Sequence, residues 1–563
     1  MKKEIEKILE KALEKLNFDV KSVKIEVDYP KNEVFGDYST NVAMVLAKTA
    51  KRSPMEIANK INSQIATYDL RQFEKIEIAK PGYINFYLSA EYLRKKVEEI
   101  NKLDGKYGDL ENKEKTMIEY SQPNTHKEFH IGHLRNVIIG NTLVNVLKKA
   151  GMKVISANYI GDTGTHVSKC LWGLLKFHKN EDWQKVENKS EFLGKVYSES
   201  VRKIKENEEY EQEFKEIQRR FEKGDKEVVE LWEKTRKFSL DEFEKMYKKL
   251  GVNFDVYFFE SEEEREGKKM LSELLKTRVI KESDGAIIAD LEKYNLGVLV
   301  LQRSDGAVLY GLKDIPLAFK KFREFKIDRS IYIVDIRQQL YFRQLFKILE
   351  LAGLKNKMTH IEYDFVNLKG GERMSSREGN IVSASSLIDQ VKNKVEKKFP
   401  ESLYPEEISL SAIKFCMLKY SSASKIEFDI EESVKLEGVT GPYVQYAHAR
   451  ICSIIKKQES GSKNQEEKAD LTLLTHEKEL GLMRELNKFP ELIEEIAEDC
   501  EVHKLPYYAI KLADKFHSFY NDLTVLDPEN PSLTSARLKL VNAVRIVLAE
   551  ALRLMGVNSP AKM

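Results

Sequence analysis

The segment from Lys115 to Ile160 most constrains how this chain can fold. Residues 116–120 are short, apolar and rich in β-favouring side chains, and residues 152–160 repeat that pattern. Between them apolar residues recur at helical spacing, and Gly151 stands where a helix C-cap is expected. Strand, helix and strand in this order predict a βαβ unit of a parallel sheet. Such a sheet binds ligands at the C-terminal ends of its strands.

The turn between the first strand and the helix contains two histidines, His130 and His133, around Gly132. At a helix N-terminus the backbone favours an anion, glycine lets a ligand approach closely, and histidines can donate to phosphate oxygens. A second interpretation is a zinc site, because His126 and His130 have the i, i+4 spacing of two metal ligands. Pro123 and Gly132 argue against one continuous helix, so we favour a phosphate site.

Length and charge bound the class of protein. The 563 residues exceed what one hydrophobic core supports, so about two to four domains are expected. The 93 Lys and Arg residues against 91 Asp and Glu leave a net charge of +2, which does not indicate a nucleic-acid partner by itself. We find no apolar run long enough to span a membrane and no signal-peptide core, and therefore expect a cytoplasmic protein without a membrane partner.

The four cysteines give no indication of a metal site or a disulfide framework. They are scattered along the chain without the paired spacing of metal-binding cysteines: Cys170, Cys416, Cys452 and Cys500. Reduced thiols in a cytosolic protein fit this pattern, and we predict no resident metal.

The N-terminal residues predict a small α/β domain. Apolar residues at helical spacing over 5–16 precede an alternating strand pattern at 23–27. Residues 35–41 resemble a turn that caps a following helix, and 84–88 alternate as a second strand. The domain is expected to end near residue 110, in a polar, glycine-containing stretch.

Further along, densely charged residues interrupt the sheet pattern. Residues 178–250 carry sparse apolar positions at helical spacing, which favours exposed helices inserted into the catalytic fold. Short apolar runs at 285–290, 298–306 and 330–335 then predict that the sheet resumes. The loop 161–166 contains two glycines at a strand end, where a ligand site and a plain tight turn are equally good interpretations.

A second glycine-flanked loop spans residues 370–380. Glycines give such a loop freedom to close over a nucleotide, and its arginines and hydroxyls suit contacts with a triphosphate. The residues predicted to bind ATP here are Arg373, Met374, Ser375, Ser376 and Arg377.

The two loops, in this order, resemble the HIGH and KMSKS elements of class I aminoacyl-tRNA synthetases. Residues 130–133 match the first element letter for letter, whereas 373–377 agree with the second at Met374 and Ser375 but lack a lysine at Ser376. Three longer strings are similar to the arginyl-tRNA synthetase version of this class: Ser121 to Arg135, Gly161 to His166 and Thr440 to Arg450.

The resemblance covers the whole chain and implies three domains. Residues 1–110 would form an added α/β domain that contacts the elbow of the tRNA. Residues 111–400 would form a Rossmann-type doubly wound parallel-sheet catalytic domain with a helical insertion at about 178–280. Residues 401–563 would form an all-α anticodon-binding bundle.

The reaction implied by the resemblance joins ATP and L-arginine into arginyl-adenylate and pyrophosphate, then transfers arginine to the 3′ end of tRNA(Arg). The catalytic and ATP-binding residues would be His130 and His133, with Gly132 in the same turn and Mg²⁺ assisting. An ionised carboxylate needs no protein base to activate it. The partners implied are L-arginine, ATP and tRNA(Arg), and we expect a monomer.

The arginine pocket is also assigned by match to the family. Glu119, Asp314, Tyr310 and Gln338 would line it, and Asn124 would hold the α-amino end of the substrate. Carboxylates suit the planar fork of a guanidinium. From its position alone, Asp314 is better explained as a residue near a helix N-terminus than as a ligand group.

The missing loop lysine leads to a further expectation. In arginyl-tRNA synthetases without it, a lysine near the HIGH turn is thought to replace its charge, and Lys127 lies three residues before His130. Lys127 would then be catalytic. The alternative is a solvated surface lysine, with Arg373 or Arg377 supplying the charge instead.

In the C-terminal part, aromatic residues could stack on unpaired anticodon bases. The candidates are Tyr507, Tyr508, His517 and Tyr520, whereas Phe516 and Phe519 are expected in the core. Three alternatives stay open at this point: a synthetase for another amino acid, an inactive tRNA-binding paralogue, and a zinc hydrolase built on the three histidines.

Overall fold

The computed structural model describes residues 1–19, 23–370, 382–461 and 469–563. Within them, one five-stranded parallel sheet forms the centre of the molecule, in the order β12-β11-β5-β6-β7. Its strands are β5 (Lys115–Glu119), β6 (Lys153–Ile160), β7 (Val256–Phe259), β11 (Arg329–Asp335) and β12 (Lys357–Tyr363). The expected βαβ unit and parallel sheet are confirmed, and the C-terminal ends of β5, β6 and β11 meet at one edge.

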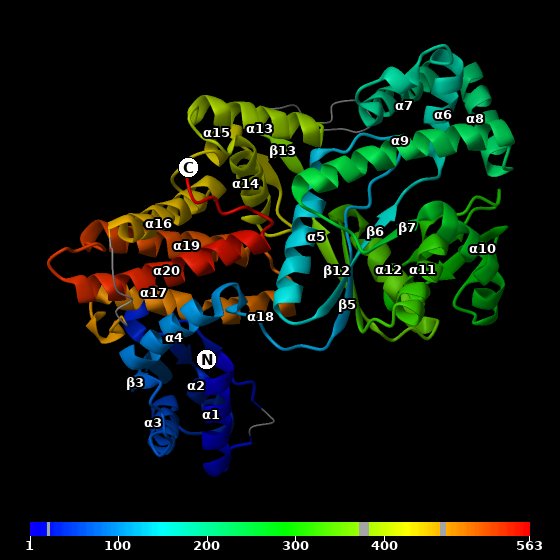
Figure 1. Ribbon diagram of the computed structural model, residues 1–563. Helices are drawn as coiled ribbons and strands as arrows, with labels where there is room; N and C mark the ends of the chain where they lie inside the picture. The colour runs from blue at the N-terminus through cyan, green and yellow to red at the C-terminus, as the bar shows by residue number, and fades with distance from the viewer. Residues whose placement is uncertain (20–22, 371–381, 462–468) are drawn as a thin grey trace.

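Helix α5 (Ile131–Lys149) connects β5 to β6 and is buried on almost every side. It packs on the sheet and also contacts α14 (Pro405–Leu418) and α18 (Phe489–Asp499) of the C-terminal bundle. Figure 1 shows α5 standing between the sheet and the bundle. Burial on two sides explains why apolar residues are not confined to one face of this helix.

The buried guanidinium of Arg135 fixes the first turns of α5. It donates to the carbonyl oxygens of Asp364, Ser424 and Ser421 at 2.6, 2.7 and 3.1 Å. These acceptors lie close to the short parallel pair β13 (Val366–Leu368) and β14 (Ile426–Phe428). The start of α5 is therefore anchored to a second structural unit as well as to the sheet.

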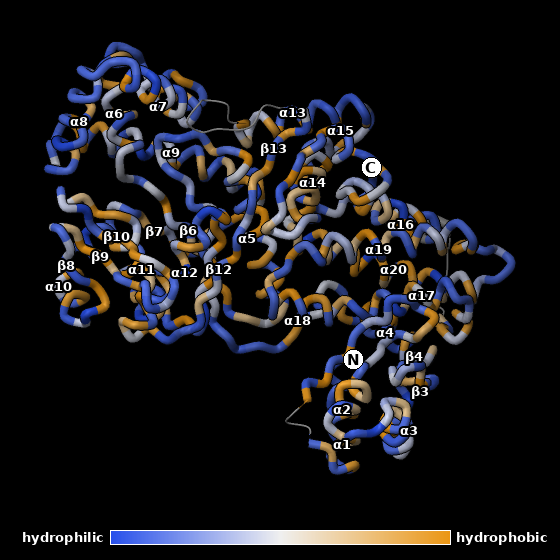
Figure 2. Tube along the Cα trace, turned by 180° about the vertical axis from the view of Figure 1, so that it is seen from behind, coloured by the Kyte–Doolittle hydropathy of each residue, from blue (hydrophilic) through white to orange (hydrophobic). Residues whose placement is uncertain are grey.

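Helices α6 (Thr165–Phe177), α7 (Lys189–Glu206), α8 (Glu208–Glu222) and α9 (Lys226–Leu250) form the insertion. It rises above the sheet at the upper right of Figure 1, and hydrophilic residues are frequent along its helices in Figure 2. The expected end of the insertion near residue 280 is wrong, because β7 already belongs to the central sheet. This strand has only four residues, which is too short for a periodic pattern to reveal.

Helices α10 (Glu260–Lys276), α11 (Tyr310–Glu324) and α12 (Gln339–Leu351) follow β7 and cover the sheet. The runs near 285–290 and 298–306 do form strands, but they do not extend the central sheet as expected. They pair antiparallel as β9 (Ala286–Asp290) and β10 (Val298–Gln302), next to β8 (Lys281–Ser283). Apolar runs look the same in sequence whether they join a parallel sheet or a separate hairpin.

The N-terminal part is a four-stranded antiparallel sheet in the order β1-β2-β4-β3, covered by helices. Its elements are α1 (Lys2–Lys15), β1 (Val27–Asp28), β2 (Tyr38–Thr40), α2 (Val42–Ala50), α3 (Pro54–Ile65), β3 (Phe73–Ala79), β4 (Tyr83–Leu88) and α4 (Ala90–Leu103). Two expectations need correction. Residues 38–40 form a strand instead of continuing a turn, and the strand expected at 23–27 is β1, which begins at Val27.

The C-terminal part consists of helices. They are α13 (Ala384–Lys398), α14, α15 (Ile430–Ser433), α16 (Gly441–Gly461), α17 (Glu477–Asn487), α18, α19 (Lys504–Asp522) and α20 (Pro531–Leu554). Phe516 and Phe519 are fully buried, as predicted. The prediction that Tyr508 offers a stacking surface is wrong, because it is 7% exposed and donates to the carbonyl of Glu485 at 3.0 Å. Tyr507 is 49% exposed.

The N-terminal part docks against this bundle through Glu491 of α18. The carboxylate accepts hydrogen bonds from Tyr29 and Tyr38 and pairs with the N-terminal amine at 3.0 Å. Helix α4 lies beside α17 and α20. Among the described residues, no helix combines the length and the apolar character needed to cross a bilayer.

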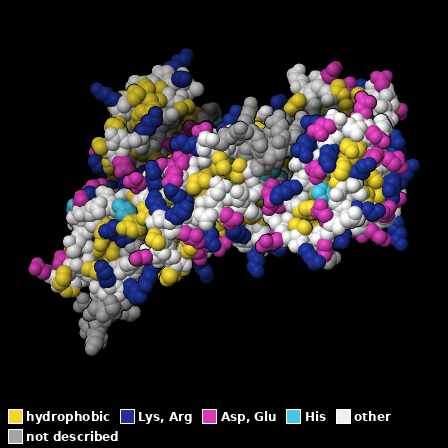
Figure 3. Space-filling model, turned by 90° about the horizontal axis from the view of Figure 1, so that it is seen from above, with side chains coloured by type: hydrophobic (Ala, Val, Ile, Leu, Met, Phe, Trp, Pro, Cys, Tyr) yellow, Lys and Arg dark blue, Asp and Glu magenta, His cyan; other side chains and the backbone are white. Residues whose placement is uncertain are grey.

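Acidic and basic side chains are interspersed over the face seen in Figure 3. This agrees with the net charge of +2. Attraction for a polyanion must therefore arise from local groups at particular sites rather than from the whole surface.

Candidate active site

The connection from β5 to α5 is held in an unusual backbone conformation. Ser121, Gln122 and His126 have φ values of +76°, +47° and +61°, which non-glycine residues rarely adopt. The backbone amides of Ser121 and His126 donate to Asn136 Oδ1 at 2.6 Å and Ser239 Oγ at 2.9 Å. Side chains from α5 and the insertion thus fix a strained loop directly before the HIGH turn, as is common where geometry serves function.

His130 and His133 cap the N-terminus of α5 reciprocally. His130 Nδ1 accepts from the amides of Gly132 at 3.1 Å and His133 at 3.4 Å, while His133 Nδ1 accepts from the amide of His130 at 3.3 Å. The rings stack with centroids 3.8 Å apart. A neutral imidazole nitrogen that accepts carries no proton, so each ring has its N–H at Nε2.

Burial keeps both histidines neutral at ordinary pH. It lowers the pKa of His130 to about 4, with the charge of Lys127 as a further cause, and it holds the pKa of His133 well below its usual value. The turn therefore offers two Nε2–H donors and the helix N-terminus without carrying a fixed charge. This arrangement suits an anion whose charge grows during reaction.

A cavity of about 910 Å³ opens at the C-terminal edge of the sheet, below helix α7. Residues from the β5–α5 connection, from α7 and from the end of β11 line it, among them Gln122, Asn124, Lys127, His130, His133, Tyr197, Arg202, Lys205, Asp335 and Gln338. Five predicted site residues are thus brought together: Asn124, Lys127, His130, His133 and Gln338.

Lys127 faces this cavity and is not a freely solvated lysine. Its Nζ lies 5.3 Å from the ring centroid of Tyr197 on α7, and its carbonyl accepts from Ser190 Oγ at 3.5 Å. Burial lowers the pKa of the amine, and the carboxylate of Glu260 partly offsets this. The interpretation as a surface lysine is therefore wrong.

The two predicted pocket carboxylates, Glu119 and Asp314, do not line this cavity themselves. Glu119 is 3% exposed, and its Oε1 accepts from Gln122, which lines the cavity, at 2.8 Å. Asp314, on α11, accepts a hydrogen bond from the hydroxyl of Tyr341 through Oδ2. Burial raises the pKa of Asp314 to about 7, and the nearby charge of Glu119 contributes.

Tyr310 is the first residue of α11, is 63% exposed and does not line this cavity. Residues 373–377, predicted to contact ATP, fall outside the described residues. The stem that follows them is joined to the HIGH turn: Ile131 N donates to Val382 O at 3.2 Å and Ala384 N to Phe129 O at 2.9 Å.

Sequence reasoning missed two groups around the pocket. Lys321 of α11 contacts Glu119, and Tyr341 of α12 contacts Asp314. The only available signal for Lys321 was its spacing, because it follows Asp314 by seven residues and so lies on the same helix face. A lysine at that spacing is usually exposed, and the sequence does not show that this face is the buried one.

The loop 161–166 supports the site structurally. A Cβ atom at Gly161 would lie 2.3 Å from Asn124 Oδ1, so only glycine leaves room for the amide. Asp162 is buried, pairs with Arg236 at 2.8 Å and accepts from Ser261 at 2.7 Å. The loop thus positions Asn124 through a close approach of its backbone.

His126 does not join the other two histidines. Its ring nitrogens contact the hydroxyls of Thr125 at 3.0 Å and Thr235 at 2.7 Å, and it is fully buried. In the described parts of the chain, no group of three or more His, Cys, Asp or Glu side chains is arranged to hold a metal ion. The geometry does not support the zinc interpretation.

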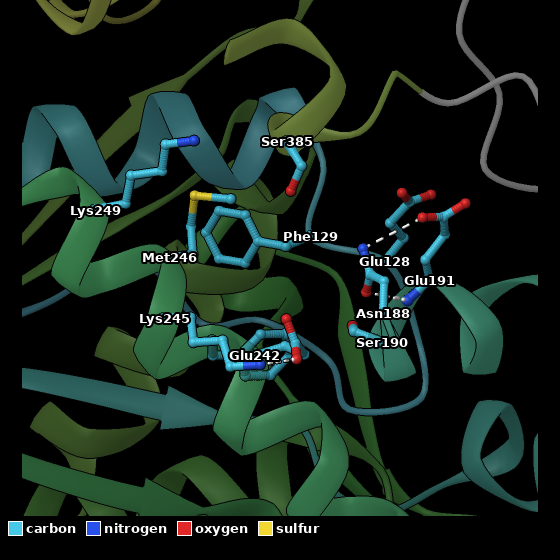
Figure 4. Close-up of a pocket in the computed structure, with 11 residues that line it drawn as sticks. Glu128, Phe129, Asn188, Ser190, Glu191, Glu242, Lys245, Met246, Lys249 and Ser385 are labelled. Atoms are coloured by element: carbon cyan, nitrogen blue, oxygen red, sulfur yellow. Dashed lines mark hydrogen bonds and ion pairs between the residues drawn. The ribbon is translucent and has the colours of Figure 1, made fainter. Parts of the chain in front are cut away.

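A second cavity, of about 140 Å³, lies behind the turn (Figure 4). Phe129 points into it beside Met246 and Lys249 of α9, and Glu128 and Glu191 lie at its other side. The ring of Phe129 also packs against His133 at 5.1 Å. The residues around this cavity thus pack behind the HIGH turn.

A family model described as "tRNA synthetases class I (R), catalytic domain" matches residues 96–415. The model "Arginyl tRNA synthetase N terminal domain" matches 3–88, and "DALR anticodon binding domain" matches 444–563. The chain belongs to the arginyl-tRNA synthetase family. Members of this family are ATP-dependent aminoacyl-tRNA ligases, so the alternatives of a zinc hydrolase and of a synthetase for another amino acid are set aside.

Individual relatives agree with this family assignment. The arginine–tRNA ligase of Bdellovibrio bacteriovorus is 34% identical over 96% of this chain and 94% of its own length. The arginine–tRNA ligase 1 of Bacillus cereus is 34% identical over 95% of each chain. The structure of the Thermus thermophilus arginyl-tRNA synthetase matches with a TM-score of 0.83 and 27% identity, covering 100% of both chains. The expected fold class is thereby confirmed.

Proposed function

We propose that this member of the family activates L-arginine with ATP at the 910 Å³ cavity and transfers it to the 3′ end of tRNA(Arg). The observation that carries the assignment of the site is the pair of Nε2–H donors on His130 and His133, which face the cavity at the N-terminus of α5. The protein is an arginine–tRNA ligase that supplies charged tRNA for protein synthesis.

In the first step the carboxylate of arginine attacks the α-phosphorus of ATP and pyrophosphate leaves. Because the carboxylate is already ionised, the chain supplies orientation and charge stabilisation rather than a base. His130 and His133 donate to the phosphate oxygens, and Asn124 holds the α-amino end of the substrate. Lys127 neutralises charge on the pyrophosphate.

Mg²⁺ is proposed to enter with the triphosphate. The carboxylate of Glu128 lines the cavity, and a hard oxygen ligand of this kind suits a magnesium ion that keeps most of its waters. When bound, the ion adds positive charge next to the phosphates.

The guanidinium is proposed to bind above Glu119 and Asp314. Asp314 Oδ1 is buried and has no hydrogen-bond partner among the described residues, so it offers an unused acceptor. Tyr310, at the start of α11, and Gln338, beside the end of β11, would close the pocket around the substrate. A guanidinium provides five donors in one plane, which matches acceptors that converge from several directions.

The function is tested directly by charging total tRNA with each of several radioactive amino acids. We expect transfer of arginine only, together with arginine-dependent exchange of pyrophosphate into ATP when tRNA is present. Absence of exchange with tRNA present would identify the chain as an inactive paralogue that still binds tRNA.

The KM for arginine should depend on pH through Asp314. Its pKa in the free enzyme is about 7, and a bound guanidinium favours the ionised form. Arginine therefore binds best above pH 7, and its KM should rise about tenfold between pH 8 and pH 6, because one protonated carboxyl must ionise. Asp314→Asn should raise the KM at pH 8 by at least about tenfold and remove this dependence.

Initial rates of pyrophosphate exchange at several pH values measure this effect. The KM for ATP serves as the internal control and should stay within about twofold across the series. A wild-type KM for arginine that is flat from pH 6 to pH 8 would contradict the assignment of Asp314.

The N-terminal part is proposed to hold an unpaired base of the tRNA elbow. A cavity of about 520 Å³ there is lined by two exposed aromatic rings, Phe35 and Tyr83, with Asn41, Asn85 and Lys31 beside them. Aromatic stacking together with amide hydrogen bonds is the usual way to bind a single-stranded base.

Tyr83→Ala should raise the KM for tRNA about fivefold to tenfold, since one base–aromatic stack is worth about 1 to 3 kcal/mol. The KM for arginine and the kcat should not change. Tyr68→Ala, in the same domain but outside the cavity, is the control. Equal effects of the two variants on tRNA would show that this cavity does not bind RNA.

The three proposed domains, 1–110, 111–400 and 401–563, then contact the elbow, the acceptor end and the anticodon of one tRNA. In the third, His517 lies beside Tyr446, and Arg450 lies 4.5 Å over the ring of Tyr520. This cluster supplies both stacking surfaces and positive charge for unpaired bases. We further propose that the enzyme acts as a monomer in the cytoplasm.

A further inference from the structure

A fully buried lysine, Lys321, lies next to the proposed arginine pocket and has no assigned part in the reaction. It is 0% exposed, and its Nζ lies 2.5 Å from Glu119 Oε2. The same ammonium lies 4.2 Å over the ring of Tyr332. Desolvation by burial lowers the pKa of Lys321, but the charge and hydrogen bond of Glu119, together with Tyr332 and Asp314, outweigh it. The pKa is therefore raised, and the ammonium stays charged.

The negative charge of Glu119 is consequently neutralised by a positive charge inside the protein. Oε2 is paired with Lys321 and Oε1 accepts from Gln122. A buried ion pair of this kind is neutral as a unit, and its geometry is fixed by a short contact on one side and an amide on the other. Glu119 therefore presents fixed acceptor lone pairs to the pocket without adding net charge.

Asp314 differs from Glu119 in this respect. It lies two helical turns before Lys321 on α11, its hydrogen-bond donor is the neutral hydroxyl of Tyr341, and its Oδ1 is unused. The titratable groups that face Asp314 come from every element packed around it: Glu119 of β5, Tyr159 of β6, Glu260 of α10, Lys321 of α11, Tyr332 of β11 and Tyr341 of α12. Glu260 is itself paired with Lys313, at 3.3 Å.

We propose that Lys321 is a specificity-determining positioning residue that sets the charge of the arginine pocket. It neutralises and orients Glu119, so that only Asp314 keeps a negative charge for a bound cation to neutralise. This inference rests on the proposed arginine site and deepens it. With one uncompensated negative charge, the pocket accepts one positive charge, and the fixed lone pairs of Glu119 and Asp314 select the planar fork of a guanidinium.

Without Lys321, two buried carboxylates would face each other without a counter-charge. Like charges at short range cannot both ionise easily, so Glu119 and Asp314 would share a proton and release it only at higher pH. The pocket would then lose its fixed acceptors at neutral pH. A purely structural lysine would lack this effect, since its loss would weaken packing without changing where the pocket titrates.

The decisive measurement is the pH dependence of the KM for arginine, from pyrophosphate exchange with the full-length enzyme and tRNA. Its midpoint is the pH at which the KM begins to level off at its low value. Lys321→Met should raise the KM for arginine at pH 7 by at least about tenfold and move the midpoint of the pH dependence up by at least about one unit. Lys321→Arg, which keeps the charge, should leave the midpoint near that of the wild type. The KM for ATP should stay within about twofold in all variants.

Two further variants isolate the charge effect. Lys320→Met removes the neighbouring lysine, which pairs with Glu263 at 2.8 Å, and should change neither the KM nor the midpoint. Glu119→Gln/Lys321→Met removes both charges of the buried pair, and its midpoint should return to near that of the wild type. If Lys321→Met does not fold, the double variant provides the test. It removes both charges of the buried pair and leaves the packing nearly unchanged.

An unshifted midpoint in Lys321→Met would overturn the proposal, and so would a shifted midpoint in the double variant when the single variant cannot be studied. The proposed function would fail differently. If Asp314→Asn left the KM for arginine unchanged, the pocket itself would be misplaced, and the role of Lys321 would fall with it. A tenfold effect of Asp314→Asn with no effect of Lys321→Met would keep the pocket and reject only Lys321.

Discussion

Replacing Lys127 with alanine is expected to lower kcat for arginyl-adenylate formation about a hundredfold and to change the KM for arginine little. Pyrophosphate leaves with additional negative charge, and Ser376 in the second loop carries no charge to stabilise it. Lys127 lines the same cavity as His130 and His133, and its positive charge is one cause of the lowered pKa of both histidines. It is therefore close enough to act on the same anion.

The second reaction step provides the internal comparison. Transfer of arginine from presynthesised arginyl-adenylate to tRNA no longer involves pyrophosphate, so Lys127→Ala should perform it nearly as well as the wild type. Lys189→Ala removes another lysine near the start of α7, one that lies over Phe238 at 5.6 Å, and should affect neither step. Equal losses in both steps, or no loss in the first, would move the role to Arg373 or Arg377.

The sequence contained enough to predict the central βαβ unit and the place of the two histidines at a helix N-terminus after a parallel strand. Both depend on local features: two short apolar runs, helical spacing between them, and a glycine flanked by histidines at the junction. A helix N-terminus at the end of a parallel strand creates an anion site wherever it occurs, so neither distant contacts nor side-chain packing had to be known.

The charge state of the arginine pocket could not be predicted in this way. Glu119 and Lys321 are 202 positions apart and meet only because β5 and α11 pack together. In the sequence Asp314 resembles an ordinary residue near a helix N-terminus, and only its buried Oδ1, which has no partner among the described residues, distinguishes it. Similarly, four residues of β7 gave no periodic signal, yet they end the insertion and start α10, which supplies Glu260.

The neutral state of the two histidines also depends on packing. Histidines in a turn would ordinarily titrate near pH 6.5, and no sequence pattern around His130 and His133 predicts a lower pKa. Reciprocal capping of α5 buries both rings and commits each Nδ1 to accept from a backbone amide. The pair is therefore a preorganised set of donors rather than a pair of charges, and it should not impose a titration near pH 6.5 on the free enzyme.

Gly132→Ala provides the sharpest test of that preorganisation. A Cβ atom at Gly132 would lie 3.0 Å from both Cε1 and Nδ1 of His130, so the ring must move. Movement of the ring would weaken the 3.1 Å hydrogen bond from the Gly132 amide to His130 Nδ1 and disturb the stacking of His130 on His133. The Nε2–H donor of His130 would then be displaced, and a methyl group would stand where the anion approaches the backbone.

We expect Gly132→Ala to lower kcat for adenylate formation about a hundredfold, because the donor of His130 is displaced and one such donor is worth about a hundredfold. Thermal stability should stay equal or rise slightly, since alanine is favoured over glycine inside a helix by about 1 kcal/mol. Gly140→Ala in the same helix is the contrasting control: its Cβ would lie 2.2 Å from the ring of Tyr120, so the midpoint of thermal unfolding should fall. A stable Gly132→Ala enzyme with wild-type kcat would mean that catalysis does not depend on the orientation of His130.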